Sequence, residues 1–270
     1  MTQDVDGDYP APGESIAVLN RLLRMWHAHD GGASIPLLDG TSLPALAIHV
    51  QVEHVAELTE SIIELIRHNV YLSTAPLFRL SMECAVNAVW WASDPARVRA
   101  SVHEAARQSD LFVRSVRRVQ PGAFSDSAGM TESIKEFARF ASLDARVFER
   151  RCRAIQGGAW IYPRYRLLSE SSHGGIALLS EYSVHGTRTA TNPDGLALVQ
   201  RPHYRHLELA LETQVILFAL ALAAWESVLP DHPDETELFE LANDLGFGDL
   251  LQTAIGRPSP GVTGTPQDAG

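Results

Sequence analysis

Residues 215–225 read Val-Ile-Leu-Phe-Ala-Leu-Ala-Leu-Ala-Ala-Trp, an uninterrupted apolar run that decides the fold of this chain. A helix that is apolar on every side is stable only when other parts of the protein, or a membrane, cover it. A membrane span needs about 20 such residues. This run is shorter, because Glu208 and Glu212 precede it and Glu226 follows it. We therefore expect a helix over about 203–229 that is buried at the centre of a helical protein and does not span a membrane.

Segments with helical periodicity precede and follow this central helix. Their apolar residues recur at spacings of three and four, which is typical of helices with one buried face. The expected helices cover about 14–29, 46–71, 74–93, 95–118, 131–155, 163–174 and 234–245. The sequence thus predicts an all-α, single-domain bundle of about seven helices over 14–255, between a disordered leader, 1–13, and a disordered tail, 256–270.

One stretch, about 183–201, does not follow the helical pattern. Asn192-Pro193-Asp194-Gly195 is a strong turn signal, because Asn and Asp cap turns and Gly accepts a positive φ. Thr-rich and Leu/Val segments flank it, so we expect a small β-hairpin or an ordered loop near 185–200.

Composition limits the classes of function. The net charge is −11, which argues against nonspecific binding of nucleic acid over the whole surface but leaves room for a local basic cleft. Lys135 is the only lysine beside 21 arginines, a bias typical of GC-rich bacterial genomes. Cys84 and Cys152 have no metal or disulfide spacing, and the acidic N-terminus is unlike a signal peptide. We expect a cytoplasmic bacterial protein.

Most common catalytic motifs are absent. The sequence has no Gly-rich phosphate loop, no dinucleotide fingerprint, no CxxC, no HExxH and no GxSxG. This absence argues against the common nucleotide-dependent and hydrolase machineries, and we expect no cofactor.

A first polar constellation lies in the short helix expected at 163–174. Tyr165, Ser169 and His173 are at i, i+4 and i+8 and would share one face, with Arg166 beside them. A titratable His and an Arg suit general acid–base chemistry on a phosphodiester. The alternative is structural: His173 serves the last helical turn before Gly174, and the hydroxyls bond to the backbone.

The Arg166–His173 spacing, inside a long helical bundle, resembles the HEPN class of bacterial helical domains, which includes ribonuclease toxins and abortive-infection proteins. The family motif is an Arg, four to six residues, and a His; here six residues intervene. The family usually has a polar residue after the Arg, where this chain has Leu167. The resemblance implies Arg166 and His173 as a catalytic pair, a homodimer, and RNA bound in a cleft across it.

A second constellation combines carboxylates with histidines. Glu170-x-x-His173 is the pairing used by di-iron bundles, in which two such pairs and two further glutamates converge. A dimetal site would draw on residues from four helices: Glu64, His68, Glu83, Glu170, His173 and Glu212. The spacing of Glu64 and His68 differs from the motif, and such pairs are common on solvated helix faces.

Two more groups are candidates for lining a cleft. Arg79 and Glu83 are at i, i+4 on an apolar helix, where a structural ion pair is one interpretation and a site the other. His203 and His206 stand at the start of the central helix. Three functions stay open: a metal-independent ribonuclease of a toxin or defence system, a non-enzymatic helical interaction or scaffold protein, and a dimetal oxidase.

Overall fold

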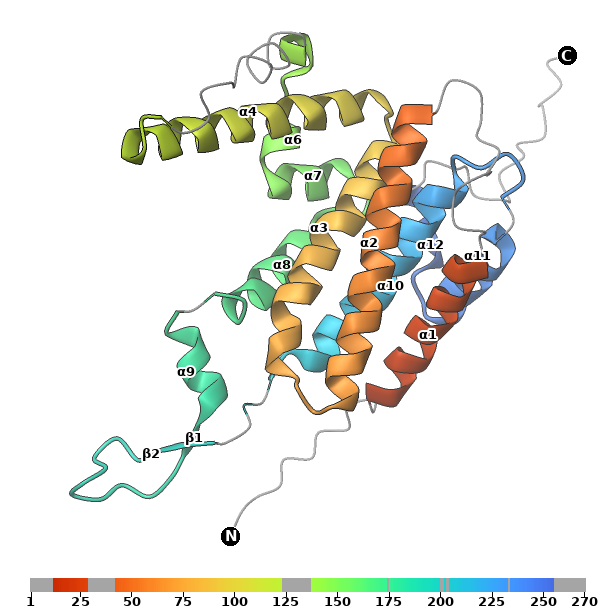
Figure 1. Cartoon of the computed structure of the whole chain (residues 1–270). Helices are drawn as coiled ribbons and strands as arrows, with labels where there is room; N and C mark the ends of the chain where they lie inside the picture. The colour runs from red at the N-terminus through yellow and green to blue at the C-terminus, as the bar shows by residue number, and fades with distance from the viewer. Residues whose placement is uncertain are drawn as a thin grey trace, which may run out of the picture.

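The computed structural model describes residues 12–28, 42–122, 137–173, 175–199, 202, 204–232 and 234–254. Within these residues the protein is all-α with one small antiparallel hairpin, which confirms the predicted fold class (Figure 1). The predicted leader and tail lie outside the described residues, except that Pro12 and Gly13 belong to the first helix.

The centre of the bundle is α10 (Leu207–Glu226), which contains the apolar run. It packs against α1 (Pro12–Ala28), α2 (Ser42–Arg67) and α3 (Ala75–Ala92), as Figure 1 shows. Fifteen of its 20 residues are buried, so neighbouring helices cover every side of it. In the described part of the chain α10 alone is long and apolar enough to cross a membrane, and 72% of its most apolar window is buried in the protein.

A polar contact crosses this apolar core. The Gln214 amide on α10 donates to Thr59 Oγ1 on α2 and to Ser81 Oγ on α3, both at 2.7 Å. All three side chains are buried. Because buried polar groups are costly without partners, these contacts fix the register of the three helices.

Four further helices form a flank beside α3 and across its end (Figure 1). Pro95 precedes α4, whose first turn is held by Asp94. The flank consists of α4 (Ala96–Val119), α6 (Leu143–Arg146), α7 (Phe148–Ala154) and α8 (Ile161–Glu170), with the short 3-10 turns Ala138–Phe140 and Gly158–Trp160 between them. A third such turn, Leu72–Thr74, joins α2 to α3.

The prediction of one helix over 131–155 is wrong for its described part. Ser142 is extended and its side chain accepts from the Asp144 N–H, which makes it the N-cap of a new helix, α6. Val147 is extended as well, with φ −116° and ψ 112°, and separates α6 from α7. The local caps therefore override the helical periodicity. Residues 131–136 lie outside the described residues.

The C-terminal third holds the hairpin and three shorter helices. α9 (Ala177–Tyr182) leads into β1 (Ser183–His185), which pairs antiparallel with β2 (Leu196–Leu198), and α11 (Glu235–Asp244) and α12 (Gly248–Ala254) follow α10. The Asn192 side chain bonds both backbone groups of Leu196, and Gly195 has φ +65°. The predicted hairpin is confirmed, together with its turn residues.

Candidate functional site

The polar cluster with the most contacts lies where α3 meets α8. The Arg79 guanidinium on α3 is its centre: Nε donates to Glu83 Oε1 at 3.3 Å and to the Tyr165 hydroxyl at 3.0 Å. Its Nη1 lies 2.8 Å from Nε2 of His173. The Arg79 guanidinium thus connects Tyr165 on α8 and His173 in the following turn to Glu83 on α3.

Hydrogen-bond direction assigns the donors and acceptors in this cluster. The Tyr165 hydroxyl donates to Glu83 Oε1 at 2.7 Å. Burial, and then the bond to Glu83, raise the pKa of Tyr165, so the phenol stays protonated at neutral pH. Because a guanidinium only donates, a hydrogen bond in this contact requires His173 Nε2 to accept. The cluster therefore places an imidazole nitrogen against a permanent cation.

The position of His173 differs from the predicted one, because α8 ends at Glu170. Ser172 bonds to the preceding helix turn twice: its hydroxyl donates to Leu168 O and its N–H to Ser169 O. Such side-chain bonds to the backbone compete with helix continuation. His173 is an exposed residue of the turn and reaches Arg79 from there. Gly174 lies outside the described residues.

Ser169 and Arg166 do not join the cluster in these contacts. The Ser169 hydroxyl donates to the Tyr165 carbonyl at 2.6 Å and is buried, which is the structural role that the sequence left open. Arg166 is exposed, and the hydrogen bond that it donates to Tyr162 raises its pKa. The structure thus pairs His173 with Arg79, where the motif spacing pairs it with Arg166.

The six carboxylate and imidazole residues of the dimetal hypothesis are not brought together. Glu64 and His68 pair with each other at 2.9 Å on the exposed face of α2, and Glu212 lies 3.4 Å from Arg164. Glu170 is exposed at the end of α8. In the described ranges no group of three or more His, Cys, Asp or Glu residues is placed to hold a metal ion.

The remaining cleft candidates lie at the start of α10. His203 is outside the described residues. His206 precedes α10, and its ring lies 6.4 Å from that of Tyr204, which in turn lies 6.4 Å from Phe78. Burial raises the pKa of Tyr204. These rings support the packing of α3 on the entry to α10 and add no titratable group to the cluster at Arg79.

Two residues of the site were not singled out as site residues from the sequence. The Phe148 ring on α7 lies 4.3 Å from the Tyr165 ring, and the Arg151 guanidinium lies 5.4 Å above Phe148. The sequence signal for Arg151 is that it stands among several arginines, at 146, 150, 151 and 153. Nothing in that pattern distinguished it from its neighbours Arg150 and Arg153.

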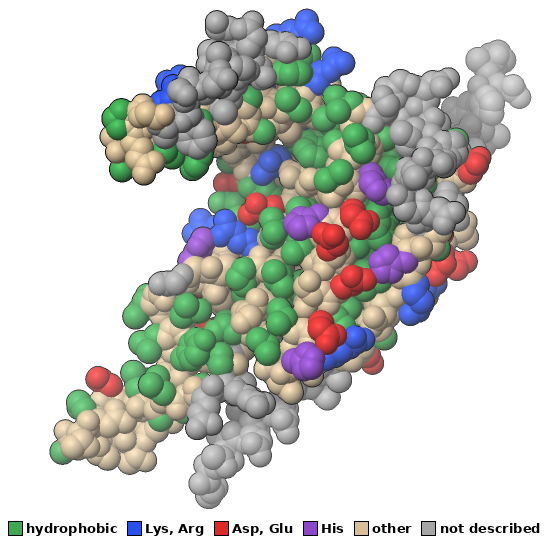
Figure 2. Space-filling view, viewed as in Figure 1, with side chains coloured by type: hydrophobic (Ala, Val, Ile, Leu, Met, Phe, Trp, Pro, Cys, Tyr) green, Lys and Arg blue, Asp and Glu red, His purple; other side chains and the backbone are tan. Residues whose placement is uncertain are grey.

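Charge is divided unevenly over the fold. Residues 96–170, which include the flank, contain 14 Lys and Arg against eight Asp and Glu, a net +6 in a chain of net −11. Figure 2 shows acidic side chains gathered over α2 and basic ones towards α8 and α4. The cluster at Arg79 lies where α3 meets this basic flank.

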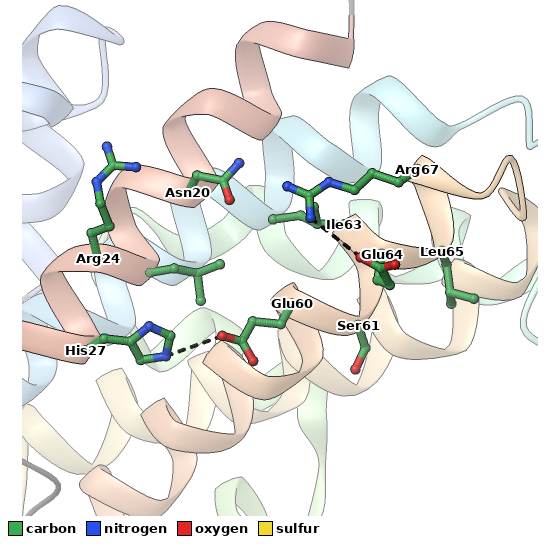
Figure 3. A pocket seen from close by; sticks show the side chains of 10 residues that line it. Asn20, Arg24, His27, Glu60, Ser61, Ile63, Glu64, Leu65 and Arg67 are labelled. Atoms are coloured by element: carbon green, nitrogen blue, oxygen red, sulfur yellow. Dashed lines mark hydrogen bonds and ion pairs between the residues drawn. The ribbon is translucent and has the colours of Figure 1, made fainter.

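Away from the cluster at Arg79, a hollow of about 780 Å³ lies between α1 and α2 (Figure 3). Its rim is charged, but the charges compensate one another: His27 lies 3.4 Å from Glu60, and Arg67 lies 3.5 Å from Glu64. Paired, solvated charges of this kind favour a surface groove without specific chemistry.

Comparison with protein-family models, with curated proteins and with solved structures finds no match.

Proposed function

We propose that the protein is a bacterial ribonuclease of a toxin or defence system that cleaves RNA by metal-independent acid–base chemistry at His173 and Arg79. One observation carries the proposal: the Arg79 guanidinium contacts the His173 imidazole at 2.8 Å, on the edge of a basic flank. The resemblance to HEPN domains points to the same chemistry, with Arg79 in the role that the motif gives to Arg166.

The proposed reaction is transesterification at a phosphodiester. When a substrate phosphate oxygen takes over the hydrogen bond from Arg79 Nη1, His173 Nε2 is left free to take the proton of the RNA 2′-hydroxyl. The 2′-oxygen attacks phosphorus, the bond to the 5′-oxygen breaks, and that oxygen takes a proton from water. The products are a 2′,3′-cyclic phosphate and a 5′-hydroxyl. Arg79 stabilises the charge that develops on the phosphate oxygens.

Glu83 and Tyr165 act as positioning residues in this proposal. Both bond to Nε of Arg79, so they hold the guanidinium in place while Nη1 can exchange His173 for a phosphate oxygen. The phenol remains a donor to Glu83 because its pKa is raised. Fixing a guanidinium by two side chains lowers the entropy lost when substrate binds.

The test is cleavage of a labelled RNA by the full chain in EDTA. Wild type should yield 2′,3′-cyclic phosphate ends, and His173→Ala and Arg79→Ala should each slow cleavage by about 10²–10⁴-fold, the usual contribution of acid–base catalysis. The matched controls are His54→Ala and Arg114→Ala, which alter a carboxylate-paired His and Arg elsewhere. Loss of activity in Arg166→Ala but not Arg79→Ala would assign the cation to the motif residue instead. No cleavage by wild type contradicts the proposal.

A second candidate function, non-enzymatic partner binding as an interaction or scaffold protein, is favoured by a specific surface. α9 and the hairpin expose large apolar side chains, of which Ile176 is 84% and Leu198 80% exposed. Exposed apolar side chains that gather on one part of the surface, as on α9 and the hairpin, are typical of protein interfaces. Under this candidate, the double variant Ile176→Ser, Leu198→Ser loses self-association or partner binding, and light scattering across protein concentration measures the self-association. His173→Ala has no phenotype in a growth-toxicity assay under this candidate, whereas the ribonuclease proposal predicts a loss of toxicity.

A further inference from the structure

Arg151 on α7 is a cation without a matching anion in the described part of the chain. Its Nε is buried with no hydrogen-bond partner there, and its Nη1 has only a 3.4 Å contact with the Ala145 carbonyl. Burial lowers the pKa of Arg151. A desolvated guanidinium with an unmet donor is costly, so such an arrangement persists where something compensates it.

The nearby carboxylates are already committed to other cations. Glu104 takes a bidentate contact from Arg107, at 2.7 and 2.6 Å. Glu149 pairs with Arg153, and Glu83 serves Arg79 and Tyr165. The two carboxylates whose charge raises the pKa of Arg151, Glu83 and Glu104, are thus held by other cations, and Arg79 and Arg151 share the field of Glu83. The site carries one positive charge in excess.

We propose that Arg151, together with Arg79, binds an oxyanion of the phosphate class in the hollow beside α7 and α8. Figure 2 shows the surface hollowed between α4 and α8, with basic side chains on its wall. A phosphate group offers several acceptor oxygens and matches guanidinium geometry. It would compensate the excess positive charge of the site.

A second phosphate-binding group next to the cleavage cluster would hold the backbone of the RNA substrate. The assignment of this site to RNA therefore rests on the proposed function. Binding itself requires no cleavage. The two claims can therefore fail separately: phosphate binding is measured with a ligand that cannot react, and cleavage with one that can.

The test is calorimetric titration of the full chain with inorganic phosphate at constant ionic strength, and with a 2′-O-methyl uridine trinucleotide, which lacks the nucleophile for cleavage. Wild type should bind at least one of them, and Arg151→Met should weaken binding at least tenfold. Arg150→Met is the matched control: it removes the adjacent arginine, which is exposed and paired with Asp144, and should bind as wild type does.

The melting temperature without ligand gives a second, independent measurement. Since Arg151→Met removes an uncompensated buried charge and keeps an unbranched side chain, its Tm should equal or exceed that of wild type. Arg151-dependent binding of the trinucleotide alone identifies the source as a nucleic-acid backbone, and binding of inorganic phosphate as well identifies a general phosphate site; both support the proposal. Equal binding by wild type and Arg151→Met, or a clearly lower Tm for Arg151→Met, overturns it.

Discussion

The helices around α10 and the flank formed by α4, α6, α7 and α8 are held together by different forces. The first region is closed by apolar side chains, with a buried polar junction at Gln214. In the flank, arginines pair with carboxylates and lie over aromatic rings, and Arg151 has no ion pair within the described residues. This contrast indicates that stability resides chiefly in the core, and the chemistry that we propose lies at its border with the flank, where Arg79 meets His173.

The largest expected effect on stability is in α10. Phe218 is fully buried, so Phe218→Ala should lower the free energy of unfolding by about 3–5 kcal/mol through lost burial and a cavity. Urea denaturation measures it. Phe112→Ala is the control, since that ring on α4 is 59% exposed, and it should cost less than about 0.5 kcal/mol. Similar losses in the two variants would remove the distinction between core and flank.

Thiol reactivity tests whether the flank unfolds locally while the core stays folded. Burial raises the pKa of Cys84 on α3 to about 11 and that of Cys152 on α7 to about 12. At pH 8 both should react with a disulfide reagent roughly 100-fold or more slowly in the native protein than in urea. Native labelling of Cys152 but not of Cys84, located by mass spectrometry, would show that α7 unfolds locally.

A smaller loss is expected at the polar junction of the core. Gln214→Leu removes two donors to Thr59 and Ser81, and should cost about 1–2 kcal/mol because those hydroxyls stay buried. Gln156→Leu, at an exposed position, provides the baseline in the same urea titration. A stabilised Gln214→Leu protein would mean that the core tolerates a purely apolar junction.

The smallest effect is expected within the flank and depends on pH. The hydrogen bond from Arg107 lowers the pKa of Glu104. Its contribution is therefore present above the ordinary value of 4.5 and is lost as the pH falls from there through the lower folded-state pKa. Glu104→Gln should cost about 0.5–1 kcal/mol at pH 7 and nothing at a pH below both values. An equal cost at both pH values, by urea midpoint, would contradict an ionic origin.

The sequence predicted the features that depend on neighbouring residues. The run from Val215 to Trp225 identified the buried helix, and Asn192 to Gly195 the hairpin turn, because periodicity and turn chemistry are local. The break at Ser142 and Val147 was missed, because a cap and one extended residue are weak signals inside a helical pattern.

The site was predicted only in part, for a physical reason. Arg79, Tyr165 and His173 were each named, but their contact joins positions 94 residues apart and depends on how α8 lies on α3. Spacing within one segment favoured Arg166 as the partner of His173, and no local pattern could show that the guanidinium would come from another helix.

The most direct test of the account compares wild type and His173→Ala in two measurements on the same preparation: the rate of RNA cleavage in EDTA and the free energy of unfolding. We expect the rate to fall by about 10²-fold or more, while stability changes by less than about 1 kcal/mol, because His173 lies exposed beside the core. Equal rates, or loss of activity only through loss of folding, would contradict the claim that the border between core and flank carries the chemistry.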